Sequence, residues 1–249
     1  HRTIDTGLLI GGSTNYYHWL IDFLPRFHLL VKAGIDIGSY HIIVNSGQTR
    51  FQLETLDLLG IRHEQLIEVD AGEVLAVGKL VVPAILSTNT FVAKEVLDWL
   101  RQFGLSHLSR EFAGHKRRLF ISRADATVRR LINEDEVYAA LEPLGFELFV
   151  PGAHSFIEQV ETFSNAECIV GPNGAGLTNL VFAPPNALII DIKNTISAAQ
   201  FFENLAGQLK LSYRPLVGEA IMTDASRKKH DSDMRIEPRL VIEAMRSHL

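Results

Sequence analysis

Short apolar runs alternate along the chain with longer segments in which apolar residues recur every three or four positions. The first pattern is typical of buried strands and the second of amphipathic helices. Regular alternation of the two predicts parallel sheets with helices on both faces. The run Leu188–Ile192 is almost continuously apolar, which is typical of a central parallel strand covered on both sides. We therefore expect an α/β protein.

The individual elements can be placed from the same patterns. The expected strands are Gly7–Ile10, His41–Asn45, Leu66–Val69, Lys79–Val82, Arg118–Ser122, Glu147–Val150, Cys168–Val170, Leu188–Ile192 and Ser212–Leu216. The expected helices are Tyr17–Ala33, Arg50–Leu59, Thr90–Phe103, Glu134–Leu141, Phe156–Ser164, Leu177–Phe182, Ala198–Gln208 and Pro238–Ser247. Ligands of such sheets bind beyond the carboxyl ends of the strands.

A polar, irregular stretch divides the chain into two halves that each alternate strands with helices. Residues 1–104 are expected to form an amino-terminal, acceptor-side domain, residues 105–116 a linker, and residues 117–249 a carboxy-terminal, ligand-binding domain. Two such halves predict two Rossmann-like domains that face each other across a cleft. We expect the last helix, Pro238–Ser247, to pack back on the first domain, and the polar segment Asp224–Glu237 to form a surface loop.

Composition excludes several classes of protein. The 24 Lys and Arg residues are outnumbered by 29 Asp and Glu, a net charge of −5, which argues against a general nucleic-acid binder. The one cysteine, Cys168, lies in an apolar run and is predicted to be a buried strand residue. No apolar run approaches the roughly 18–20 residues that span a bilayer, and no signal peptide is visible. We expect a cytoplasmic protein that can associate peripherally with the inner face of the membrane.

The first polar cluster follows the first expected strand, in the segment NYYHWLIDFLPR (15–26). One continuous helix here would place His18, Asp22 and Arg26 along a single stripe, with a kink at Pro25. A carboxylate one turn from an imidazole orients the ring and raises its proton affinity, so the pair could supply a general base. The alternative is an ordinary polar pair, four residues apart, on a solvated helix face.

A second cluster is rich in arginine. Arg123 follows an expected strand, Arg129 and Arg130 lie in the next loop, and Asn133 is expected to cap the helix that begins at Glu134. Two or three guanidinium groups at a strand end and a helix start suit a diphosphate. The alternative is a solvated basic loop that pairs with the acidic start of the helix.

A third cluster is the glycine-rich turn Asn173-Gly174-Ala175-Gly176, which joins a strand to a helix that carries Asn179. Glycines let a ligand approach the backbone, and helix amides can bind phosphate. The turn lacks both the GxGxxG fingerprint and the P-loop pattern. A tight turn without a ligand is the alternative, since such turns favour glycine in any case.

Two further motifs have simpler interpretations. Ser155 and Glu158 have the spacing of a capping box, whereas capping leaves Gln159 unexplained. A literal DxD occurs at Asp231-Ser232-Asp233, but no apolar strand precedes it, and a divalent cation needs several preorganised oxygens. We therefore predict no metal site.

In this order, the motifs resemble glycosyltransferase family 61, including its bacterial capsular polysaccharide members. The residues that carry the resemblance are NYYHWLIDFLPRF (15–27), RRLFISR (117–123), RRLINE (129–134), SFIEQ (155–159) and GPNGAGLTNLVFAPP (171–185). The similarity extends from Asn15 to Ile192. One position departs from the family, whose last motif usually reads GPHGAGLTN, because Asn173 stands where the histidine would be.

The resemblance implies a GT-B type fold with a shortened amino-terminal domain. It also implies an inverting transfer of a hexose, N-acetylhexosamine or pentose from a nucleotide sugar, with a UDP-sugar as the expected donor and no required cofactor. The acceptor would be a glycan, a lipid-linked saccharide or another hydroxyl compound. We assign catalysis to His18 and Asp22. We assign donor binding to Arg123, Arg130, Asn133, Glu134, Ser155, Gln159, Asn173, Gly174, Ala175, Gly176 and Asn179.

Two other classes of function remain as alternatives. The first is a non-catalytic protein that binds a nucleotide sugar or a glycan on the same fold, which the departure at Asn173 favours. The second is a dinucleotide-dependent oxidoreductase, which the missing GxGxxG fingerprint disfavours. Turnover of a donor with an acceptor separates the first from an enzyme, and binding of a nicotinamide cofactor tests the second.

Overall fold

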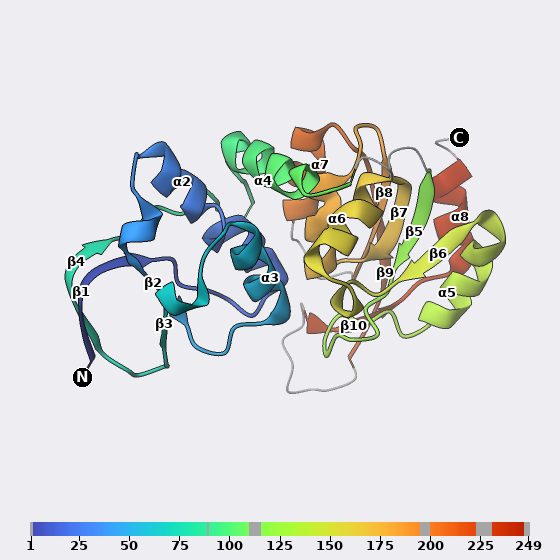
Figure 1. Ribbon diagram of the computed structural model, residues 1–249. Coiled ribbons are helices and arrows are strands. Elements are labelled where there is room, and N and C mark those ends of the chain that lie inside the picture. Colours follow the sequence, from blue (N-terminus) through green and yellow to red (C-terminus); the bar gives the residue numbers. More distant parts are fainter. Residues whose placement is uncertain (1, 89, 110–115, 195–199, 223–230, 247–249) are drawn as a thin grey trace. The chain divides into compact units, whose positions relative to one another are not determined.

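The computed structural model describes residues 2–88, 90–109, 116–194, 200–222 and 231–246. Its internal contacts define two compact units (Figure 1). Unit 1 comprises His1–Thr88 and Val92–Gln102, and unit 2 comprises Asn89–Phe91 and Phe103–Leu249. Both contain parallel strands and helices, which confirms the predicted α/β class. Residues 110–115 of the expected linker lie outside the described residues.

Unit 1 is built on a four-stranded sheet in the order β3-β2-β1-β4, in which every neighbouring pair is parallel. The strands are β1 (Arg2–Leu9), β2 (His41–Asn45), β3 (Leu66–Val69) and β4 (Leu75–Val81). In register, Leu8 of β1 pairs with Ile42 of β2 and with Val81 of β4. The strand order reverses between β1 and β4, so the loop after β1 starts at a topological switch point.

The helices of unit 1 are short and interrupted. They are α1 (Tyr16–His18), the π-helix η1 (Trp19–Phe23), α2 (Arg26–Lys32), α3 (Arg50–Leu58) and the start of α4 (Lys94–Ser106), with 3₁₀ turns η2 (Ile37–Ser39) and η3 (His63–Gln65). Asn15 caps α1 by accepting hydrogen bonds from two backbone amides, and a capping box starts α3. The buried Trp19 indole donates to Thr55 Oγ1 at 2.8 Å, which fixes η1 against α3.

Unit 2 contains a six-stranded sheet in the order β10-β9-β8-β7-β5-β6. Its strands are β5 (Arg117–Ile121), β6 (Phe146–Phe149), β7 (Ala166–Pro172), β8 (Leu188–Asn194), β9 (Ser212–Ile221) and β10 (Asp233–Arg235). All neighbours are parallel except β10, which pairs antiparallel with β9. The switch point lies between β5 and β7, because the chain passes from β5 to β6 on one side and then to β7 on the other.

Helices cover both faces of this sheet (Figure 1). They are α5 (Glu134–Leu141), α6 (Phe156–Ser164), the 3₁₀ helix η7 (Ala175–Phe182), α7 (Phe201–Leu209) and α8 (Pro238–Arg246), with 3₁₀ turns η5 (Glu142–Leu144) and η6 (Pro151–Ala153). The core beneath α5 and α8 contains Phe120, Val170, Ile190 and Val241, each without exposed surface. Because side chains alternate along a strand, Ile189, Asp191 and Lys193 of β8 face the side of α6, η7 and α7.

Three expectations about unit 2 are corrected here. The segment Asp224–Glu237 is not simply a surface loop, because Asp233–Arg235 form β10 and Asp233 and Met234 are fully buried (residues 224–230 lie outside the described residues). The last helix, α8, packs into the core of unit 2 through Val241 and Met245, which differs from the expected packing on the first domain. The expected helix Leu177–Phe182 is a 3₁₀ helix.

Candidate active site

The loops that follow β5, β6 and β7 meet at the carboxyl edge of the unit 2 sheet. A Cβ atom on Gly174 would lie 1.6 Å from Nη1 of Arg123, and one on Gly176 would lie 3.0 Å from Cγ of Pro151. Gly174 has an extended φ of 178°, so the requirement for glycine comes from space and not from backbone strain. The turn after β7 is therefore pressed against Arg123 in the loop that follows β5, at the switch point where open α/β sheets bind ligands.

Arg123 is held by the loop that follows it. Its Nε donates to the carbonyl of Arg129 at 3.2 Å, and its Nη2 donates to the carbonyl of Val128 at 2.9 Å. Burial lowers the pKa of Arg123 to about 10, and the neighbouring positive charge of Arg129 acts in the same direction. Among the described residues, Nη1 of Arg123 has no hydrogen-bond partner, so it remains available at the glycine turn.

Arg129 has the features of a residue held for function. Its φ of 55° is in the left-handed region, which non-glycine residues adopt only where surrounding structure enforces it. Its Nε is buried and has no hydrogen-bond partner in the part of the chain that the structure describes. Within the described residues neither Arg123 nor Arg129 forms an ion pair, although the charges of Asp125, Asp233 and Glu134 partly oppose the lowering of the Arg123 pKa. Two guanidinium groups close enough to interact can attract an anion. The sequence does not single out Arg129, because the dipeptide Arg129-Arg130 does not show which of the two arginines is paired within the fold.

Arg130, in contrast, is engaged within unit 2. Its Nη2 and Nε lie 2.7 and 3.2 Å from Oδ2 of Asp233, and its backbone amide donates to Oδ1 of the same residue at 2.9 Å. Asp233 has no exposed surface, whereas nearly half of the Arg130 side chain is exposed. The second aspartate of the DxD motif therefore binds an arginine in this structure.

Glu134 and Asn133 fix the segment after β5. Glu134 accepts hydrogen bonds from Ser122 Oγ and, at 3.1 Å, from the backbone amide of Arg123. Asn133 stands at the capping position of α5, but its side chain forms no capping bond. It exchanges two hydrogen bonds with the backbone of Ile236, at 2.9 and 3.3 Å. Asn133 thus occupies the predicted N-cap position of α5 without the expected side-chain bond, and it ties the start of α5 to the segment after β10.

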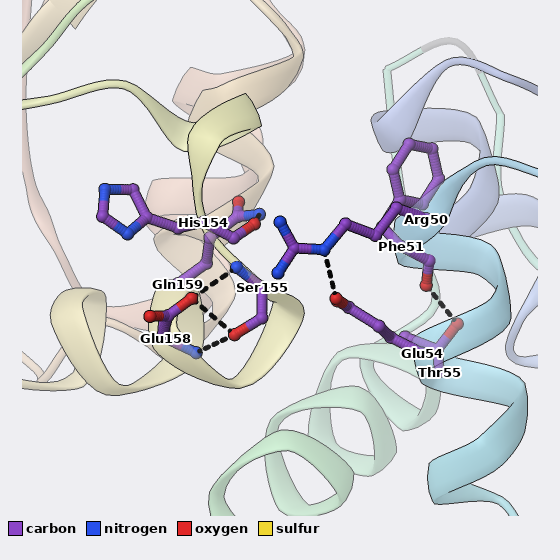
Figure 2. A network of polar contacts seen from close by, with 8 residues as sticks. All are labelled: Arg50, Phe51, Glu54, Thr55, His154, Ser155, Glu158 and Gln159. Atoms are coloured by element: carbon purple, nitrogen blue, oxygen red, sulfur yellow. Dashed lines mark hydrogen bonds and ion pairs between the residues drawn. The ribbon is translucent and has the colours of Figure 1, made fainter.

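The predicted capping box of α6 is confirmed. Ser155 Oγ accepts from the amide of Glu158, and the Glu158 carboxylate accepts from the amide of Ser155 at 2.6 Å (Figure 2). Gln159, which capping left unexplained, donates to the carbonyl of His154 at 3.2 Å and accepts from Asn179 Nδ2 at 2.8 Å. Both amides are buried, and together they fix η7 against α6 behind the glycine turn.

The catalytic candidates lie in unit 1, after the switch point of its sheet. Nδ1 of His18 lies 2.7 Å from Oδ2 of Asp22, so the predicted contact is confirmed. About half of the His18 side chain is exposed, whereas Asp22 is mostly buried and also accepts a hydrogen bond from Ser87 Oγ. Burial and the charge of Asp22 raise the pKa of the adjacent Tyr17. Ser87 thus anchors one oxygen of the Asp22 carboxylate, and the other oxygen orients the accessible imidazole of His18.

The predicted stripe does not extend to Arg26. The π-helix Trp19–Phe23 carries Asp22, and α2 restarts after Pro25, so the regular helical spacing is lost. Arg26 is buried, donates to the carbonyl of Ile10 at 2.9 Å, and has its pKa lowered by that burial. It stabilises the end of β1 and forms no hydrogen bond with His18 or Asp22 among the described residues, although the charge of Asp22 acts on it.

Among the described residues, no group of three or more His, Cys, Asp or Glu side chains is arranged to hold a metal ion. None of the helices in the described ranges is long and apolar enough to cross a membrane.

The fold and the site define an α/β protein in which two arginines and a glycine turn follow the carboxyl ends of strands in one sheet. The family model described as Glycosyltransferase 61 matches residues 16–190. The chain belongs to glycosyltransferase family 61, and the resemblance seen in its motifs is confirmed at the level of the family.

Curated relatives of known activity are plant glycosyltransferases. Beta-1,2-xylosyltransferase XYXT1 of Oryza sativa subsp. japonica is 34% identical over 202 residues, which cover 73% of this chain and 43% of the relative. Alpha-1,3-arabinosyltransferase XAT3 of the same species is 33% identical over 132 residues, covering 49% and 23%. A beta-1,2-xylosyltransferase of Arabidopsis thaliana is 33% identical over 130 residues, covering 47% and 22%. The chain spans less than half the length of each of these relatives.

Solved structures with partial likeness are also glycosyltransferases. A family 9 glycosyl transferase from Veillonella parvula DSM 2008 has a TM-score of 0.43 and 9% identity, covering 98% of this chain and 97% of that chain. The iron-containing dodecameric glycosyltransferase TibC from enterotoxigenic E. coli H10407 has a TM-score of 0.38 and 14% identity, covering 77% and 59%. Both TM-scores lie below 0.5.

Proposed function

We propose that this chain is an inverting glycosyltransferase of the GT-B type that transfers a sugar from a nucleotide sugar to a hydroxyl group of a glycan acceptor. The observation that carries the proposal is Arg123 against the glycine turn, with Arg129 close enough to lower its pKa, in a chain that belongs to family 61. Donor binding is assigned to unit 2, and the acceptor and the catalytic base are assigned to unit 1.

The donor diphosphate is proposed to bind at the switch point of unit 2. Arg123 Nη1 and the Arg129 guanidinium supply positive charge there, and the amides at the start of η7 add hydrogen-bond donors. Such preorganised donors stabilise the negative charge that develops on the leaving diphosphate. The hydrogen bonds of Glu134, Gln159 and Asn179 keep these loops in place.

The proposed reaction is a single displacement at the anomeric carbon. The acceptor oxygen forms a bond to that carbon while the bond to the donor diphosphate breaks, and the diphosphate leaves with the bonding electron pair. His18, oriented by Asp22, takes the proton of the acceptor hydroxyl. If His18 is not the base, Asp22 is the next candidate, because Oδ2 of its carboxylate lies 2.7 Å from Nδ1 of His18.

The similar plant enzymes are named for xylosyl and arabinosyl transfer, so a pentose is the first sugar to test. A ligand that binds only the folded chain raises its stability by about 2.7 kcal/mol at a concentration 100 times Kd. We expect UDP-xylose or another UDP-sugar to raise Tm, and UDP alone to raise it less. The measurement is a thermal-shift screen of UDP-sugars, with NADH as a control for the oxidoreductase alternative. Stabilisation by NADH and by none of the nucleotide sugars would contradict the proposal.

Chelation is expected to leave sugar transfer largely intact. The arginine pair supplies the charge that a divalent cation would otherwise bring to the diphosphate, and Asp233 of the DxD motif is occupied by Arg130. The measurement is the transfer rate in EDTA and after adding back Mg²⁺ or Mn²⁺. A rate that EDTA abolishes and Mn²⁺ restores would move the assignment of charge to acidic residues, starting with Asp231 and Asp233.

A further inference from the structure

A charged side chain lies buried directly beneath the glycine turn. Asp191 is the fourth residue of β8, where it is in register with Gly171 of β7 and Pro215 of β9. It has no exposed surface and faces the side of the sheet that η7 covers. The proposed reaction does not use this carboxylate, although Asn173, which precedes Gly174, is bonded to it.

Three groups converge on one oxygen of this carboxylate. Asn173 Nδ2 donates to Oδ2 of Asp191 at 2.8 Å, and the Tyr213 hydroxyl donates to the same oxygen at 2.5 Å. Nζ of Lys193 lies 3.8 Å from it and above the ring of Tyr213. Burial raises the pKa of Asp191, and the hydrogen bonds from Tyr213 and Asn173 and the charge of Lys193 oppose that rise.

The other oxygen, Oδ1, is buried and has no hydrogen-bond partner among the described residues. A buried acceptor left unsatisfied costs free energy, and an apolar side chain of similar size would avoid that cost. Stability alone therefore gives no reason for an aspartate at this position. The carboxylate does have one specific effect at the site, which is that it determines how the neighbouring amide is oriented.

Asn173 can present only one kind of group to a ligand in this arrangement. The donors Tyr213 and Lys193 around Oδ2 favour the ionised form of Asp191. An ionised carboxylate only accepts hydrogen bonds and the amide oxygen has no hydrogen to give, so Nδ2 of Asn173 faces Asp191. Asn173 is 2% exposed, and its backbone amide donates to the carbonyl of Ile192 at 2.8 Å, so the residue cannot swing outward. The amide oxygen, Oδ1, receives no hydrogen bond from the described residues.

We propose that Asn173 recognises a hydroxyl or N–H group of the nucleotide sugar through its carbonyl oxygen, and that Asp191 is the positioning residue that fixes this orientation. The inference rests on the proposed function. Within donor binding it gives Asn173 the role of a specificity-determining acceptor, because a carbonyl oxygen repels a phosphate oxygen and binds a donor hydrogen.

The test is a double-mutant cycle on donor affinity. Kd for UDP-xylose and for UDP is measured by isothermal titration in the parent, in Asn173→Ala, in Asp191→Asn and in the double variant. Asn173→Ala should raise Kd by about 10-fold, the effect of one lost hydrogen bond in a buried site. Asp191→Asn should raise Kd as well, and the double variant should bind no more weakly than Asn173→Ala, because Asp191 acts through Asn173. An effect confined to UDP-xylose places the recognised group on the sugar, and an effect shared with UDP places it on the nucleoside.

Tyr213→Phe is the matched control, because it removes a hydrogen bond to the same oxygen of Asp191 without touching Asn173. It should lower Tm and leave Kd within about 2-fold of the parent, since one net hydrogen bond is worth little to a site that it does not reach. Additive effects of Asp191→Asn and Asn173→Ala on Kd would overturn the positioning role. Parental affinity in Asn173→Ala would overturn the acceptor role, with the proposed function intact. A parent that binds no nucleotide sugar would overturn the proposed function and this inference with it.

Discussion

Arg129→Ala is expected to lower kcat/KM for sugar transfer by about 10²–10³-fold, the range for losing one preorganised donor to a developing charge. The Arg129 side chain has no hydrogen-bond partner among the described residues that could account for it, and it lies close enough to Arg123 to depress that residue's pKa. A bound diphosphate would relieve this repulsion between like charges. The measurement is kcat/KM together with Kd for UDP, with Tm recorded for each variant.

The left-handed backbone of Arg129 provides a second variant that separates binding from folding. Glycine adopts a φ of 55° without strain, so Arg129→Gly should keep or raise Tm while losing donor affinity as Arg129→Ala does. A residue retained only for packing would not show a loss of affinity together with a gain in stability. Arg129→Lys keeps the charge but loses the forked geometry, and it should fall between the parent and Arg129→Ala.

Arg130→Ala is the matched control, because it removes the adjacent arginine on the same loop. Its removal leaves Asp233 without its cation in a site with no exposed surface, so Tm should fall clearly while the folded fraction keeps most of its affinity for UDP. The opposite result, with strong loss of affinity in Arg130→Ala and parental affinity in Arg129→Ala, would restore Arg130 to the diphosphate and leave Arg129 as a loop residue.

The sequence predicted the elements of the fold closely where apolar periodicity was strong. His41–Asn45, Leu66–Val69 and Phe156–Ser164 have the bounds expected for them. The strand β10 was missed because Asp233-Met234-Arg235 contains only one apolar residue. Its burial comes from pairing with β9 and from the ion pair of Asp233 with Arg130, and neither is local in the sequence.

The sequence predicted the types of residue in the candidate site better than it predicted the contacts that these residues make. Spacing alone placed His18 beside Asp22, since four residues make about one helical turn. It could not show that a π-helix carries Asp22 and separates Arg26 from the pair, because one wide turn leaves no mark in the apolar pattern. Spacing also could not distinguish Arg129 from Arg130. It could not find Asp191 either, because the proposed role of this β8 residue depends on its contact with Asn173, which follows the neighbouring strand β7.

His18→Ala and Asp22→Asn are each expected to lower kcat by about 10²–10⁴-fold, the contribution of a positioned general base. Donor affinity should stay near the parental value, because both residues lie in unit 1 and the proposed donor site lies in unit 2. His18 is the better candidate for the base, since about half of its side chain is exposed while the Asp22 carboxylate is occupied by His18 and Ser87. The measurement is kcat for the two single variants and the double variant, with Kd for UDP measured separately.

The pattern of the three rates distinguishes the two assignments. If His18 is the base and Asp22 orients it, the double variant should be little slower than His18→Ala, because residues that act as a unit are not additive. If Asp22 is the base, Asp22→Asn should be the more damaging single change. Ser87→Ala loses only the second anchor of the Asp22 carboxylate, so under either assignment it should cost much less than Asp22→Asn. Near-parental rates in both single variants would leave the pair as a structural contact between residues four apart, and the base would then have to be another group that reaches the acceptor.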